Sequence, residues 1–169
     1  MTTRSIRREE NDRPVERSLR FLRGGGNQSP ERRLRQTAVV FAIALAVHGA
    51  DHVRRGLDVT TTQVTWAGSV QFLLAAIALV LVYRGHPWAP PAAIAIGFSS
   101  AIGFTAAHLV PHWSSFSDSF TGSRVAPNVT VLSWGTALLE IGADIAFGWA
   151  GVRALGSDGR RDPAGSASR

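Results

Sequence analysis

Three apolar stretches of this chain each carry two ionisable side chains spaced four positions apart. These pairs, with one neighbouring carboxylate, are His48 and His52 with Asp51, His108 and His112, and Glu140 and Asp144. Four residues make about one helical turn, so both members of a pair lie on one face of a helix. Ionisable groups inside a membrane segment are costly and usually functional, so three such faces predict one shared site.

Neutral imidazole and carboxylate groups are ligands for zinc, iron, manganese or copper, and helical pairs at this spacing recur in the metal sites of bundles. We therefore expect a divalent metal ion, zinc or iron, bound by this set of residues. The predicted direct ligands are His48, His52, His108 and Glu140, and the residues predicted to orient them are Asp51, His112 and Asp144. The chain has no cysteine and one methionine, Met1, which excludes thiolate and thioether sites.

Glu140 and Asp144 are also the predicted catalytic residues. In a metalloenzyme acting on a lipid-soluble substrate, either carboxylate could be the general base for metal-bound water, or a bridging ligand of a di-iron centre.

Two alternative functions also fit the pattern. Two histidines on facing helices could clamp a haem for electron transfer, although a haem pocket needs apolar walls and gains little from carboxylates. The polar groups could instead form part of a cation or proton pathway, although the opposite half of every segment is apolar.

The elements that must position these residues are four apolar segments, at residues 37–56, 64–83, 90–113 and 129–152. A helix needs ~20 residues to cross a hydrocarbon core of ~30 Å, and each segment is of that length. The mean hydropathy of +0.07 averages them with very polar ends. The predicted fold is therefore all-α, an integral membrane four-helix bundle at 37–155, between disordered tails at 1–36 and 156–169.

The arginines predict the orientation, because the chain contains no lysine. With four spans both ends lie on one side. Fifteen of the 18 arginines then fall on that side, including Arg84 in the short turn after Tyr83. The positive-inside rule places both termini in the cytoplasm, and the lysine-free composition indicates a bacterial cytoplasmic membrane. At about 1.5 Å per residue, all seven candidate residues and Gln71 then lie in the outer half, whereas His86 belongs to a cytoplasmic turn.

The basic tail at 1–36 accounts for most of the high isoelectric point of about 11.5. Its arginines are explained by topology, so we expect no nucleic-acid partner. The expected partners are the lipid bilayer and a lipid-soluble small molecule, and an oligomer is compatible with the pattern. The strings HGADH and HLVPH are too short to identify a family.

Overall fold

The computed structural model describes residues 29–56 and 58–158, and these residues form helices with no strand. The elements are α2 (Pro30–Arg55), α3 (Thr62–Tyr83), α4 (Ala89–Phe104), the π-helical turn η1 (Thr105–Leu109) that continues α4, and α5 (Val131–Asp158). Counting α4 and η1 together, four helices are long and apolar enough to cross a membrane. The predicted all-helical fold with four apolar helices is confirmed.

Two helices are longer than the sequence predicts. Helix α2 begins at Pro30, inside the segment predicted to be a tail, because the side chain of Ser29 accepts a hydrogen bond from the backbone N–H of Arg32 at 3.3 Å. A polar cap followed by proline is a favourable helix start. Helix α5 continues to Asp158, beyond the predicted span end at 152 and domain boundary at 155. The remainder of both predicted tails, 1–28 and 159–169, lies outside the described residues.

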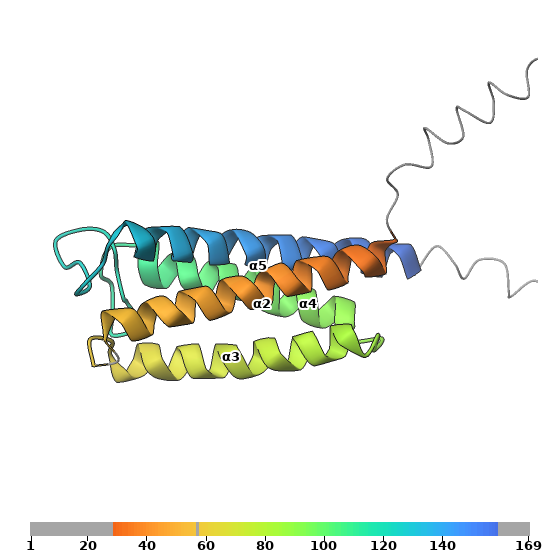
Figure 1. The fold of residues 1–169 in the computed structure, drawn as a ribbon, viewed down its shortest axis with the longest axis horizontal. Coiled ribbons are helices and arrows are strands. Elements are labelled where there is room, and N and C mark those ends of the chain that lie inside the picture. The colour runs from red at the N-terminus through yellow and green to blue at the C-terminus, as the bar shows by residue number, and fades with distance from the viewer. Residues whose placement is uncertain (1–28, 57, 159–169) are drawn as a thin grey trace, which may run out of the picture.

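The four helices run side by side along one long axis (Figure 1). At one end, which we call the loop end, lie the connections at 56–61 and 110–130. At the other, which we call the arginine end, α2 begins, α5 ends and a short turn joins α3 to α4. Helix α5 packs extensively on α4 and α2, whereas α3 packs more loosely on α4 and α2.

The half of the bundle toward the arginine end has an apolar core. Phe41 of α2 and Phe147 of α5 are fully buried, and their rings stack with centroids 4.8 Å apart. Helices α4 and α5 approach closely at Gly97, where an added Cβ would lie 2.6 Å from the backbone oxygen of Asp144 and the backbone nitrogen of Gly148. Small residues permit such backbone contact between helices. This packing fixes the position of α5 relative to α4, and with it the carboxylates that α5 carries.

Candidate metal centre

Three of the five histidines converge near the loop end. His48 and His52 come from the last two turns of α2, and His108 comes from η1. One ring nitrogen from each lies within 4.8 Å of the others, and the Nε2 atoms of His48 and His52 are 3.1 Å apart. Two nitrogens bound at about 2.1 Å to a tetrahedral ion would be separated by about 3.4 Å. His48 and His52 are thus near the separation that a shared ion requires, and with His108 within 4.8 Å the three histidines could hold a metal ion.

The π-helical turn η1 positions His108. The backbone N–H of Val110 bonds to the oxygen of Thr105, and Val110 is extended. An extended conformation is expected before a proline, here Pro111. Turns of this kind are rare and are frequent at functional sites. His108 is consequently buried, with 2% of its surface exposed, and its ring centroid lies 4.9 Å from that of His48.

Asp118, in the loop between η1 and α5, contacts two of the three histidines. Nδ1 of His108 donates to the backbone oxygen of Asp118 at 3.0 Å and lies 3.5 Å from its carboxylate. Nδ1 of His52 lies 3.9 Å from the same carboxylate. A carbonyl oxygen only accepts, so His108 carries its proton on Nδ1 and its Nε2 is free to bind a metal. Partners of this kind orient metal-binding imidazoles and raise their basicity.

Arg55 holds Asp118 in place. Its guanidinium donates two hydrogen bonds to the two carboxylate oxygens, at 2.6 and 2.7 Å, and both residues are buried. Burial alone would raise the pKa of Asp118, but the hydrogen bonds and charge of Arg55 outweigh it and hold that pKa below its ordinary value. Asp118 is therefore a carboxylate anion available to two imidazoles. The backbone oxygen of Arg55 in turn accepts from Asn128 at 2.8 Å, which ties the loop to the end of α2.

The carboxylates of α5 lie on the other side of His48. Oε2 of Glu140 is 3.6 Å from Nδ1 of His48, and Asp144 follows one turn later. Both acids are fully buried. Their four oxygens and Nδ1 of His48 have no hydrogen-bond partner among the described atoms. Glu140 is thus close to the histidine cluster, and Asp144 is one turn farther along the helix.

Three residues predicted to lie in the same half of the bundle as the site do not join the histidine cluster. Asp51 is buried, and one of its oxygens accepts from Nε of Arg54 at 2.8 Å. His112 is exposed, and it does not share a helical face with His108 because the helix ends at Leu109, before Pro111. Gln71 of α3 bonds to the side chain of Ser100. None of the three belongs to the histidine cluster.

Sequence reasoning missed Asp118 and Arg55. Asp118 is the only acidic residue between Asp58 and Glu140, an isolated charge that could have drawn attention to the loop. Arg55 enters the orientation prediction as one of the three arginines on the outer side, whereas the structure buries its side chain fully.

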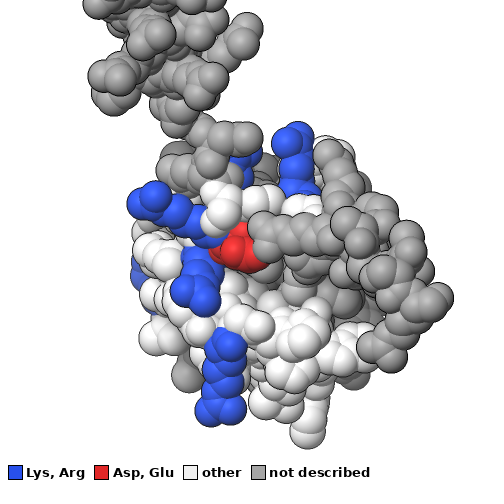
Figure 2. Space-filling view, turned by 90° about the vertical axis from the view of Figure 1, so that its right-hand side faces the viewer, with Lys and Arg blue, Asp and Glu red and all other residues white. Residues whose placement is uncertain are grey.

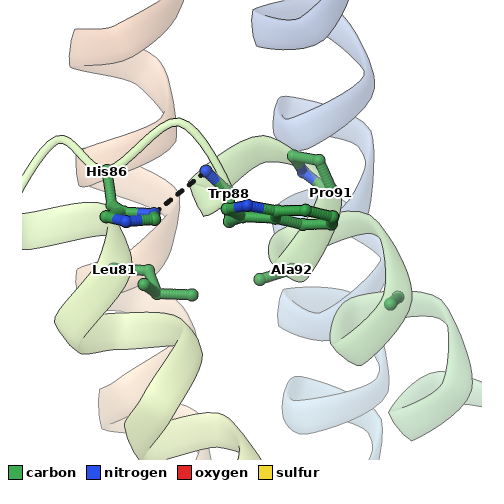
Figure 3. A pocket seen from close by; sticks show the side chains of 6 residues that line it. Leu81, His86, Trp88, Pro91 and Ala92 are labelled. Atoms are coloured by element: carbon green, nitrogen blue, oxygen red, sulfur yellow. Dashed lines mark hydrogen bonds between the residues drawn. The ribbon is translucent and has the colours of Figure 1, made fainter.

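A hollow of about 460 Å³ near the arginine end has a different character (Figure 3). Its lining residues are Leu81, His86, Trp88, Pro91, Ala92 and Ala95. Nδ1 of His86 accepts from the backbone N–H of Trp88 at 3.2 Å, as the close-up shows. This is a turn interaction within an apolar lining, in agreement with the exclusion of His86 from the predicted site.

The chain matches no protein-family model, and comparison with curated proteins and with solved structures found no significant similarity.

Proposed function

We propose that this chain is an integral membrane protein whose four apolar helices cross the bacterial cytoplasmic membrane with both termini in the cytoplasm. The helices expose large apolar side chains along their length, including Ile43, Phe72, Ile102 and Leu138. The N-terminus of α2 and the C-terminus of α5 lie together at the arginine end of the bundle. Arginines 32, 33, 35, 84 and 153 belong to the same end, and Figure 2 shows basic side chains on it. The positive-inside rule supports assigning this end to the cytoplasm and the loop end to the outside.

We further propose that His48, His52 and His108 bind a zinc or iron ion. The observation that carries this proposal is the convergence of three imidazole nitrogens within 4.8 Å. A carboxylate also lies beside Nδ1 of each of the three rings. Three protein ligands leave one coordination position open, which is the arrangement of catalytic rather than structural zinc sites. We therefore assign a metalloenzyme function over a purely structural one.

The residues around the ion have distinct roles in this proposal. The ion would supply a Lewis acid that makes water acidic near neutral pH. Asp118 keeps the rings of His52 and His108 turned toward the ion, and Arg55 keeps Asp118 in place. Glu140 is the buried carboxylate nearest the cluster, and its place beside Nδ1 of His48 suits it to orient that ring. His52 is the least buried ligand, with 22% of its side chain exposed, so a lipid-soluble substrate would approach from its side.

The geometry favours a bare ion over the haem alternative. Two axial histidines must stand on opposite faces of a porphyrin, whereas His48 and His52 stand one turn apart on α2 with Nε2 atoms 3.1 Å apart. The rings of His48 and His108 are also in edge contact, with centroids 4.9 Å apart. Ligands this close suit one small ion.

Elemental analysis and absorption spectroscopy of the full chain, purified in detergent, test the proposal. We expect bound zinc or iron without a Soret band, and a cobalt-substituted protein with the visible absorption of a tetrahedral ion. Replacing His48, His52 or His108 by alanine should abolish that cobalt absorption. His86→Ala is the matched control, because His86 lies outside the cluster, and it should leave the absorption unchanged. Cobalt absorption that survives all three cluster substitutions would refute the assignment, and a Soret band would favour haem.

A further inference from the structure

The three-histidine centre does not account for the two carboxylates of α5. Glu140 and Asp144 are both 0% exposed, and none of their four oxygens has a hydrogen-bond partner among the described atoms. Among the ion pairs formed by described residues, Glu140 contributes to one, with His48, and Asp144 contributes to none. Buried charges are normally paired or bound to a metal, because an isolated buried charge is very costly.

The arginines at the loop end do not supply the missing positive charge. Arg55 is committed to Asp118 and Arg54 to Asp51, and Arg124 is exposed. The basic group that faces Glu140 is the imidazole of His48, which is 3% exposed and directs an unpartnered Nδ1 toward Oε2 of Glu140 at 3.6 Å. An imidazole that binds a metal through Nε2 carries its proton on Nδ1, and a small side-chain shift would let that N–H donate to Oε2 of Glu140.

That hydrogen bond leaves three carboxylate oxygens without a role. They are Oε1 of Glu140 and both oxygens of Asp144, on one face of α5 and one turn apart. Carboxylate oxygens are the ligands preferred by hard divalent ions such as manganese or magnesium. Two carboxylates also carry the two negative charges that one divalent cation neutralises, which suits a site closed to solvent.

We propose that Glu140 and Asp144 bind a second divalent cation, linked to the three-histidine centre through His48. The link rests on the proposed function, because it assumes that His48 binds the first ion through Nε2. The second site itself is built from oxygens that the first ion does not use. The protein then has two neighbouring metal sites with different ligand atoms. Nitrogen atoms bind zinc or iron at the first, and oxygen atoms bind manganese or magnesium at the second.

The test counts ions on the full chain in detergent, with zinc or cobalt as the probe for the first site and manganese for the second. We expect the zinc-loaded wild type to bind one further equivalent of manganese. Asp144→Asn should weaken manganese binding at least tenfold and leave the cobalt absorption of the first site unchanged. Asp58→Asn removes an exposed carboxylate and is the matched control, which should bind manganese like the wild type.

The outcomes separate the two proposals. A wild type that shows the cobalt absorption but takes up no manganese overturns the second site and leaves the histidine centre intact, with both carboxyls neutral. Manganese binding unchanged in Asp144→Asn also overturns it. A wild type that binds neither cobalt nor manganese overturns both proposals. Should Asp144→Asn fail to fold, as judged by circular dichroism, Glu140→Gln provides the same measurement, and unchanged manganese binding there would equally contradict the second site.

Discussion

The two halves of this bundle are held together in different ways. Toward the arginine end, packing is apolar and close, with the stacked rings of Phe41 and Phe147 and the backbone contact at Gly97. Toward the loop end, the buried residues include Arg55, Asp118 and two histidines, connected by hydrogen bonds between helix and loop. The apolar half can tolerate changes of residue if volume is kept, whereas each polar partner at the loop end leaves another buried group unsatisfied when it is removed.

The substitution Arg55→Met should have the largest effect. It leaves the carboxylate of Asp118 buried without its partner, and breaking a buried pair in this way costs about 3–5 kcal/mol. We expect that loss in the free energy of unfolding, measured by denaturant titration in detergent. Arg124→Met is the control, because Arg124 is exposed and forms no ion pair with the described residues, and it should cost much less. Equal losses for both variants would mean that the buried pair does not stabilise the loop end.

The substitution Phe147→Ala probes the other half. It removes a fully buried ring that stacks on Phe41, and such truncations cost about 3 kcal/mol in well-packed cores. Cobalt affinity should stay near the wild-type value, since Phe147 is not part of the histidine cluster. Phe72→Ala, at a position 60% exposed on α3, should change stability little. Loss of cobalt binding in Phe147→Ala would show that the two halves are not independent.

The substitution Asp118→Asn tests the link between loop and metal site. It keeps the backbone oxygen that accepts from His108 but removes the negative charge beside His52 and His108. Changes to such partners typically lower metal affinity 10–100-fold, or about 1.4–2.7 kcal/mol. Cobalt titration of the folded variant measures the effect. An unchanged affinity would leave Asp118 with a structural role only.

The smallest effect is expected for His112→Ala. His112 is exposed and lies beyond the end of η1, so its removal should change stability by no more than about 0.5 kcal/mol and should not alter cobalt binding. The same titration used for Asp118→Asn provides the comparison. A loss of cobalt affinity would restore His112 to the ligand set that the sequence spacing predicted.

The sequence predicted those parts that depend on local patterns. Long apolar runs predicted four helices, and the spacing of four predicted that His48 faces the same way as His52 and Glu140 the same way as Asp144. The same rule was wrong for His108 and His112, because Pro111 ends the helix between them. The contact of Arg55 with Asp118 spans 63 positions and could not be read from any local spacing.

The π-helical turn at Thr105–Leu109 makes the site sensitive to chain length. Such a turn is equivalent to an α-helix with one inserted residue, and one residue rotates the following side chain by about 100° around the helix axis. We expect the deletion of Ala106, a residue outside the histidine cluster, to convert the turn to a regular helix and to change the direction in which His108 points. A single residue can thus separate a regular apolar helix from one that completes a three-histidine cluster.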